Sequence, residues 1–141
     1  MPNQYLIKHA PGAPGLRFFG LGPNFFPSKG LLKLQLLLNK YTFWANNRNI
    51  SELKKMLKNS SVVISIWEDK ELIGFGRATS DSIFRSVIWD VVVANNVQGH
   101  GYGSKIINAI INSPMLKNSE KIYLMTTHRS EFYEQLGFKI N

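Results

Sequence analysis

The chain has 141 residues, of which 44% are hydrophobic and 12% aromatic, so it can bury a core as one domain and does not have the composition of a disordered protein. It has no cysteine, which excludes disulfides, a thiolate nucleophile and a Cys-ligated zinc site. Its three histidines lie far apart in the sequence, so we expect no metal. The formal net charge is +8.

The positive charge is concentrated near the N-terminus. Six Lys or Arg residues precede Glu52, and no Asp or Glu does. Such a segment could meet RNA, an anionic membrane surface or a phosphate-bearing cofactor, or it could only keep the protein soluble. No signal-peptide core is visible, and no apolar run approaches the ~20 residues of a membrane span. We therefore expect a protein that is not secreted, with no membrane partner and with nucleic acid disfavoured as a partner.

The first predicted elements are helical. Residues 1–27 hold five of the six prolines, so we predict an irregular, basic, Gly/Pro-rich arm there and one folded domain over 28–141. The leucine spacing that follows predicts a helix with Ser28 as its N-cap. A second helix is predicted with Ser51 as its N-cap, and residues 41–49 form the loop between the two helices.

The rest of the chain alternates strands and helices. Two β-rich runs flank Glu68-Asp69-Lys70, which is typical of a hairpin, and the glycines at 74 and 76 indicate a bulge or a close backbone approach. Residues 86–94 are apolar on both faces and predict a central strand. A helix, a strand over 121–127, a short helix over 131–136 closed by Gly137 and the start of a last strand at 138 follow. This order predicts a mixed α/β domain with a mostly antiparallel sheet flanked by helices.

A glycine-rich stretch, "QGHGYG", stands between the central strand and its following helix. It does not match the dinucleotide fingerprint, because from Gly99 the sixth position is Ser104, and it lacks the Lys-Ser/Thr of a Walker loop. It matches Q-x-x-G-x-G. Glycines let main-chain N–H groups turn toward an anion, and a helix start adds unpaired N–H groups. The stretch therefore predicts a pyrophosphate site; the alternative is a loop that is glycine-rich only in order to turn.

Four segments together resemble the GCN5-related N-acetyltransferase (GNAT) superfamily over about residues 28–140: "VVVANNVQGHGYG", the hairpin "VVISIWEDKELIGFGRA", the strand "KIYLMTT" and the ending "EFYEQLGF". The plastid and cyanobacterial branch is the most similar. The resemblance implies the acyl-CoA acyltransferase fold, acetyl-CoA as cosubstrate, direct acetyl transfer to a primary amine without a metal, and a plastid (chloroplast) or bacterial cytoplasmic location. The chain stops soon after "GFKIN", so we expect a shortened C-terminal end of the fold. A homodimer that covers an exposed strand edge is a hypothesis.

The resemblance also implies a cofactor-binding site. Pantetheine would pair with the edge of the central strand through main-chain groups of Val91, Val92 and Val93, and the N–H near Val93 would polarise the thioester carbonyl. The amides of the glycine loop would hold the pyrophosphate: Gln98, Gly99, His100, Gly101, Tyr102, Gly103 and Ser104. Thr126 stands where many family members have an asparagine that bonds to pantetheine, so the resemblance implies a cofactor contact at Thr126 with a different side chain.

Two proton-transfer roles follow from the chemistry. The family's tyrosine matches Tyr133, whose phenol, with an ordinary pKa of ~10, can protonate the leaving thiolate; the alternative is an ordinary amphipathic-helix aromatic. For the base we favour Asp90, a carboxylate in an apolar strand whose pKa a cleft would raise. Its alternative is a structural salt bridge with Arg77 or Arg85.

Aromatic residues suggest the acceptor. Trp89, Trp44 and Phe43 could line an amine pocket, and His128 could orient the substrate; the alternative for each is a structural or surface position. We therefore expect an arylalkylamine acceptor such as serotonin or tryptamine. A protein lysine or N-terminus is the alternative acceptor, and a non-catalytic module that binds acetyl-CoA or RNA is the alternative function.

Overall fold

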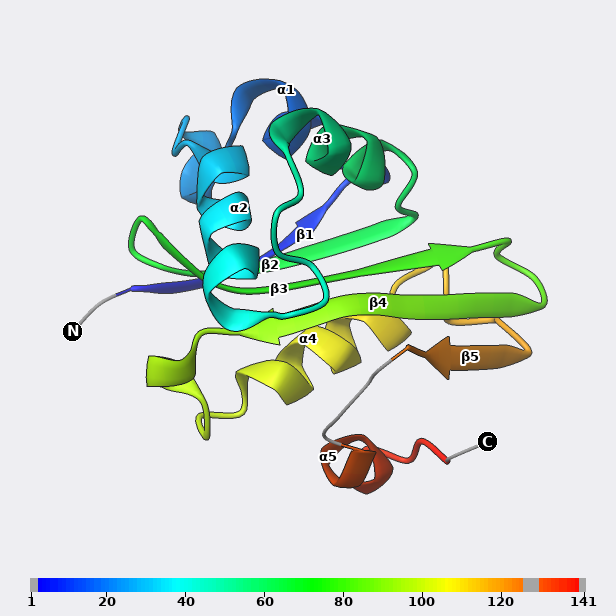
Figure 1. The fold of residues 1–141 in the computed structure, drawn as a ribbon. Helices are drawn as coiled ribbons and strands as arrows, with labels where there is room; N and C mark the ends of the chain where they lie inside the picture. Colours follow the sequence, from blue (N-terminus) through cyan, green and yellow to red (C-terminus); the bar gives the residue numbers. More distant parts are fainter. Residues whose placement is uncertain (1–2, 126–129, 140–141) are drawn as a thin grey trace.

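The computed structural model describes residues 3–125 and 130–139. Its centre is a five-stranded sheet in the order β1-β2-β3-β4-β5 (Figure 1). The strands are β1 (Gln4–His9), β2 (Val62–Glu68), β3 (Glu71–Ser80), β4 (Arg85–Val93) and β5 (Lys121–Leu124). The first four pair antiparallel, and β4 pairs with β5 in parallel. The mixed α/β class with a mostly antiparallel sheet is confirmed.

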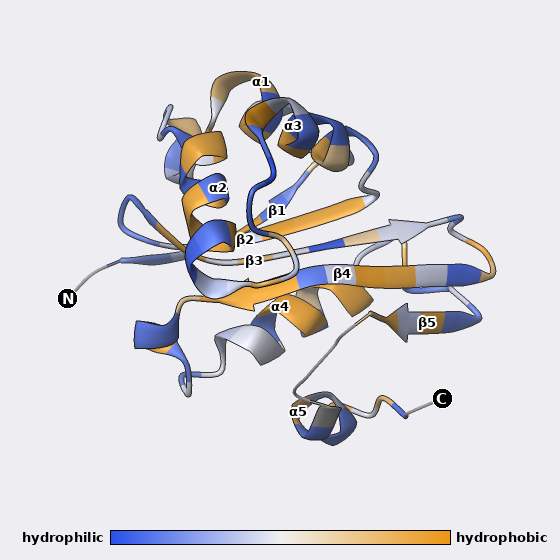
Figure 2. Ribbon diagram, in the orientation of Figure 1, coloured by the Kyte–Doolittle hydropathy of each residue, from blue (hydrophilic) through white to orange (hydrophobic). Residues whose placement is uncertain are grey.

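Helices cover both faces of this sheet. They are α1 (Pro14–Phe19), α2 (Gly30–Tyr41), α3 (Ile50–Lys58), α4 (Tyr102–Ile111) and α5 (Ser130–Gln135), with short 3-10 turns η1 (Pro23–Phe25) and η2 (Asn95–Val97). Figure 1 shows α1, α2 and α3 over one face and α4 over the other, with α5 on the α4 side beyond β5. Since both faces are covered, the middle strands are rich in apolar residues, and β2 is buried from Val62 to Trp67. Figure 2 shows these strands as hydrophobic along much of their length.

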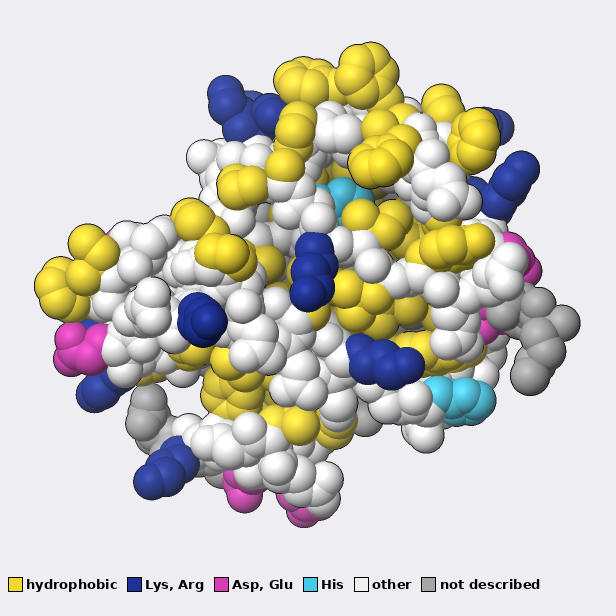
Figure 3. All heavy atoms as spheres, turned by 180° about the vertical axis from the view of Figure 1, so that it is seen from behind, with side chains coloured by type: hydrophobic (Ala, Val, Ile, Leu, Met, Phe, Trp, Pro, Cys, Tyr) yellow, Lys and Arg dark blue, Asp and Glu magenta, His cyan; other side chains and the backbone are white. Residues whose placement is uncertain are grey.

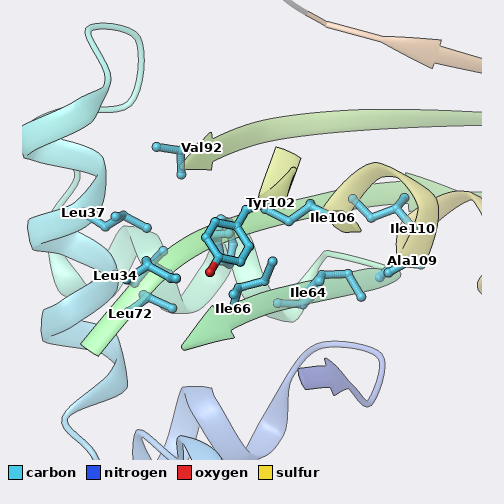
Figure 4. Packing of buried hydrophobic residues seen from close by; sticks show 14 of the residues in the cluster. Leu34, Leu37, Ile64, Ile66, Leu72, Val92, Tyr102, Ile106, Ala109 and Ile110 are labelled. Atoms are coloured by element: carbon cyan, nitrogen blue, oxygen red, sulfur yellow. The ribbon is translucent and has the colours of Figure 1, made fainter. Parts of the chain in front are cut away.

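Helix α4 packs on β3 through glycine. A Cβ added at Gly76 would lie 2.5 Å from Cγ2 of Ile106, and one at Gly74 would lie 3.1 Å from Cδ1 of the same residue. The close backbone approach expected at these glycines is therefore confirmed. Ile106, Ile107 and Ile110 are fully buried in this interface. Figure 4 shows Ile106 and Ile110 of α4 in the same cluster as Ile64 and Ile66 of β2.

The N-terminal segment differs from the prediction. Residues 4–9 are not irregular: they form β1, which pairs with β2 from Gln4↔Glu68 to His9↔Val63. Residues 14–19 form helix α1, with Leu16 buried. The expectation of an irregular arm is wrong for these two segments because the alternate side chains of β1 that are half-buried, such as Tyr5 and Ile7, pack against the core. The prolines and glycines lie between these elements or at their ends.

Both predicted helix N-caps are also wrong by one or two residues. The N-cap of α2 is Lys29, which makes no side-chain capping bond, and Ser28 instead donates to the carbonyl of Phe26. The N-cap of α3 is Asn49, whose side chain accepts from the N–H of Glu52 while the Glu52 carboxylate accepts from the N–H of Asn49. This capping box fixes the helix start two residues before Ser51.

The C-terminal elements follow the prediction in part. Gly137, at φ +99°, closes α5, and the N–H of Phe138 donates to the carbonyl of Tyr133 at 3.1 Å. Residues 138 and 139 have no strand assignment, and 140–141, with which the last strand was expected to continue, lie outside the described residues. Among the described residues, no helix is both long and apolar enough to cross a membrane.

Candidate active site

The candidate site begins where β4 extends beyond its pairing with β5. The two strands pair only from Arg85↔Lys121 to Ile88↔Leu124, and the N–H of Met125 still donates to the carbonyl of Ile88 at 3.1 Å. Residues 89–93 of β4 therefore have no pairing with β5 in the described part of the chain (Figure 1). An edge of this kind presents main-chain N–H and C=O groups to an extended ligand.

The direction of those groups follows from the sheet. The N–H of Ala94 donates to the carbonyl of Ile73 in β3 at 2.9 Å. Because successive residues of a strand direct their N–H groups to opposite edges, the N–H of Val93 is directed away from β3, toward the unpaired edge. The side chain of Val92 is buried in the core, so for these valines the main chain is the part available to a ligand.

A β-bulge interrupts β4 at this point. Arg77 pairs with Trp89 and Phe75 pairs with Val92, so two residues of β4, Asp90 and Val91, stand opposite the single residue between Arg77 and Phe75. Asp90 has φ +51°, a left-handed conformation that costs a non-glycine residue ~1–2 kcal/mol. Bulges recur beside active sites, where they redirect the strand.

Asp90 is held in an ion-pair network. Its carboxylate accepts from Nε of Arg77 at 2.8 Å, from Nη1 of Arg48 at 3.0 Å and from Nε1 of Trp44 at 3.1 Å, and its side chain is 5% exposed. Burial raises the pKa of Asp90, but the hydrogen bonds and charges of Arg48 and Arg77 outweigh burial and hold the pKa below its ordinary value. The expected raised pKa is wrong. The structural salt bridge, with Arg77 as one partner, is what the structure contains.

Arg48 is a site residue that the sequence did not indicate. It lies in the loop between α2 and α3, 42 positions before Asp90, and neither spacing nor a motif links the two. The same loop places Trp44 against Asp90, while Phe43 packs edge-on against Trp44 at 5.2 Å and is 63% exposed. The loop therefore lies over the bulge.

Trp89 has a strand-anchoring position. Its Nε1 donates to Oγ1 of Thr79 at 3.0 Å, and the guanidinium of Arg77 lies 5.6 Å from its ring centroid. Its polar group is thus used within the sheet. This contact favours the structural alternative for Trp89.

The glycine loop has the backbone conformation that its sequence predicts. Gly99 has φ +88° and Gly101 has φ +80°, and a Cβ at either would meet nothing within 4 Å, so these glycines are needed for conformation and not for space. Gly101 is the N-cap of α4. The first amides of this helix, from Tyr102 on, have no acceptor within the helix and carry its positive dipole end. This arrangement suits an anion.

Side chains of the loop have separate tasks. Tyr102 is buried in the core (Figure 4), and its hydroxyl accepts from the side chain of Gln4, whereas His100 is exposed. Nε2 of Gln98 donates to the carbonyl of Val93 at 3.1 Å and to Oδ1 of Asn95 at 2.9 Å. Gln98 therefore ties the loop to the end of β4, and it leaves the N–H of Val93 as the group for a ligand.

Helix α5 brings Tyr133 to the same region. A Cβ added at Gly103 would lie 3.0 Å from the ring of Phe132, so the start of α5 contacts the start of α4. Tyr133 is 8% exposed, packs edge-on against Phe132 and Phe138, and lines a groove between β5 and α5 together with Leu124. Thr126 and His128, the remaining predicted site residues, lie outside the described residues. The described part of the chain has no cluster of three or more metal-ligating side chains.

Comparison with known proteins agrees with this geometry. The family model "Acetyltransferase (GNAT) domain" matches residues 59–140. "Histone acetyltransferase TAP1" of Glycine max is 38% identical over an alignment of 104 residues that covers 65% of this chain and 45% of that protein. "GCN5-related N-acetyltransferase 2, chloroplastic" of Arabidopsis thaliana is 30% identical over an alignment of 122 residues that covers 81% of this chain and 45% of that protein. The chain spans about half the length of such relatives.

Solved structures share the fold. An acetyltransferase of Trypanosoma brucei has a TM-score of 0.71 at 18% identity, covering 99% of this chain and 94% of its own. A Mycobacterium tuberculosis protein crystallised in complex with CoA has a TM-score of 0.65 at 17% identity, covering 79% of this chain and 68% of its own. By its strand edge, its glycine loop and the match over residues 59–140, the chain belongs to the GNAT family of acetyltransferases.

Proposed function

We propose that this protein transfers the acetyl group of acetyl-CoA to a primary amine of a protein, either a lysine side chain or an N-terminus. The observation that carries the proposal is the unpaired edge of β4 at residues 89–93, followed directly by the glycine loop and the start of α4. The edge accommodates an extended chain and the loop accommodates an anion, which are the two ends of CoA's pantetheine-pyrophosphate arm.

The cosubstrate supplies an activated acetyl thioester. The N–H of Val93 would bind the thioester carbonyl and stabilise the negative charge that develops on its oxygen. The main-chain amides from Gln98 to Ser104 would hold the pyrophosphate. As the amine nitrogen bonds to the carbonyl carbon, the C–S bond breaks, and Tyr133 would supply a proton to the leaving thiolate.

Asp90 takes a positioning role in this proposal. Two arginines neutralise its charge and lower its pKa, so it neither attracts an ammonium nor accepts its proton effectively. The network instead fixes the β4 bulge and the loop over it. The amine would lose its proton to water.

The ion-pair network does not choose between the acceptors, because a lysine side chain and an arylalkylamine both arrive as ammonium groups, and the carboxylate of Asp90 is already paired with Arg48 and Arg77. A relative is named a histone acetyltransferase, which supports a protein acceptor. An arylalkylamine remains the second candidate, because the edge-on pair of Phe43 and Trp44 offers an aromatic surface beside the bulge. Relatives named as chloroplastic support a plastid location.

Thiol release from acetyl-CoA tests the proposal. We expect turnover with lysine-bearing peptides or peptides with a free N-terminus, and little with tryptamine. Tyr133→Phe, which removes only the hydroxyl, should lower kcat ~100-fold with little change in KM for acetyl-CoA. Tyr5→Phe, in β1 at the opposite edge of the sheet, is the matched control and should leave kcat unchanged. Turnover of tryptamine alone would establish the second candidate. Binding of acetyl-CoA without turnover of any amine would contradict acetyl transfer and favour a non-catalytic module.

A further inference from the structure

One end of the molecule exposes a concentration of large apolar side chains. We call it the aromatic end: Phe18, Phe19, Phe25, Phe26, Leu32 and Leu36. Each of the four phenylalanines is at least 66% exposed. Hydrophobic side chains gather at the top of Figure 3, the side on which Figure 1 places α1. Monomers rarely expose contiguous apolar surface of this kind without a binding role.

The aromatic end is one built surface. The carbonyl of Gly20, at the end of α1, accepts from the N–H groups of Ser28 and Gly30 at 2.9 and 3.1 Å, which joins α1 to the start of α2. The N–H of Gly22 donates to the carbonyl of Phe26 at 2.9 Å. Leu21 and Pro27 form an isolated antiparallel β-bridge. These bonds hold the rings in place relative to α2.

The backbone of this segment is strained at one of its exposed rings. Asn24, Phe25 and Lys29 have φ values of +60°, +61° and +53°, and this left-handed conformation costs a residue such as Phe25 ~1–2 kcal/mol. The ring of Phe25 is 85% exposed, so its burial does not compensate this cost within the chain. Backbone strain that burial within the chain does not offset is a reason to look for a function.

The charges around the aromatic end are positive. The guanidinium of Arg17 lies 4.5 Å from the ring centroid of Phe18, and Lys29 is exposed at the start of α2. The sequence has no acidic residue before Glu52. Surfaces that enter the interface of anionic membranes have this composition, with phenylalanine and leucine side chains flanked by lysine and arginine.

We propose that the aromatic end inserts into the interface of a membrane that carries anionic lipids, so that the protein is a peripheral membrane protein. The sequence alone led us to expect no membrane partner. A second copy fits the surface less well, because a two-fold interface would pair the same patch on both copies and so bring one positively charged surface against another. Six side chains without hydrogen-bonding groups suit a lipid interface, which requires no matching donors. The proposal does not depend on acetyl transfer.

Co-sedimentation with vesicles tests it on the full chain. The probe is vesicles of equal parts phosphatidylcholine and phosphatidylglycerol, compared with phosphatidylcholine alone. We expect binding to the anionic vesicles, weakened by salt. The double variant Phe25→Ser with Phe26→Ser should reduce the partition coefficient about tenfold. The matched control is Ile83→Ser with Phe84→Ser, an equally apolar exposed pair in the β3–β4 turn, which should bind as wild type does. Circular dichroism checks that both variants are folded.

Several results would overturn the proposal. They are absence of binding to the anionic vesicles, equal binding to neutral vesicles, and equal loss in the control variant. A dimer in sedimentation equilibrium that the Phe25/Phe26 variant dissociates, without vesicle binding, would assign the surface to a second copy. Binding to polyglutamate without vesicle binding would assign it to an acidic protein.

Discussion

At the scale of the residue, Asp90 shows how a partner decides what a carboxylate does. In an apolar strand it is a candidate general base, because burial alone raises its pKa. Arg48 and Arg77 reverse this outcome by placing donors within 3.0 Å of Oδ2. A carboxylate whose pKa is lowered in the fold stabilises the fold above its ordinary pKa, and this contribution is lost as the pH falls through the lowered value.

Asp90→Asn tests the positioning role. The variant leaves two partly buried guanidinium groups without their counter-ion, so we expect the free energy of unfolding to fall by ~2–3 kcal/mol. The shape of the kcat–pH profile should be retained, because Asp90 transfers no proton in the proposed mechanism. Asp69→Asn, at an exposed carboxylate in the β2–β3 turn, should change stability by less than ~0.5 kcal/mol. Urea unfolding and the pH profile are the measurements. A profile that loses its rising limb on the acidic side while stability is unchanged would restore Asp90 as the base.

At the scale of the element, the contact between β3 and α4 depends on missing side chains. The position that a Cβ of Gly76 would occupy lies 2.5 Å from Cγ2 of Ile106 and 3.2 Å from Cδ1 of Ile110. These are fully buried side chains of a helix whose first turn carries the glycine loop. A displacement of α4 would therefore shift the proposed pyrophosphate site.

Gly76→Ala measures that coupling. We expect overpacking to lower the free energy of unfolding by ~1–3 kcal/mol and to raise KM for acetyl-CoA. Gly137→Ala is a control with a different cause: its added Cβ would meet nothing within 4 Å, so the variant is strained by its positive φ alone and its effect should stay in α5. Calorimetry and initial-rate kinetics give both quantities. If Gly76→Ala is destabilised but keeps the wild-type KM for acetyl-CoA, the packing of α4 on β3 does not affect the proposed pyrophosphate site.

At the scale of the whole molecule, the edge strand β1 makes stability depend on pH. His9 bonds through Nε2 to Oγ of Ser65 at 2.8 Å, and Ser65 also accepts from Nε1 of Trp67. Burial lowers the pKa of His9 to about 4. The unfolded chain therefore binds a proton at a higher pH than the folded chain does. Stability is fully present above the unfolded pKa of ~6.5 and is lost as the pH falls from there toward about 4.

We expect wild type to lose ~2 kcal/mol of unfolding free energy between about pH 7 and about pH 5. His9→Gln keeps a side chain that can bond to Ser65 and should remove most of this loss. Substitution of the exposed His100 is the control and should leave the pH dependence as in wild type. Urea unfolding at the two pH values measures the effect. If wild type and His9→Gln lose the same unfolding free energy between the two pH values, a group other than His9 is responsible for the acid sensitivity.

The local sequence determined the elements with strong patterns. The hairpin at 68–71, the central strand, the glycine loop and the isoleucine face of α4 all follow from turn residues, periodicity and glycine conformation, which act over a few residues. It also permitted the backbone conformation of the loop, since glycine at positions 99 and 101 adopts the observed positive φ without steric cost.

Only the tertiary structure decided the features that depend on contacts distant in sequence. Residues 4–9 became a strand because β2 offered an edge, although prolines and glycines flank them. Asp90 is a paired carboxylate because the fold brings Arg48, which lies 42 positions earlier in the sequence, into contact with it. The exposure of Phe18, Phe19, Phe25 and Phe26 likewise follows from how α1 meets α2, since a phenylalanine in a sequence is expected to be buried until its neighbours in space are known.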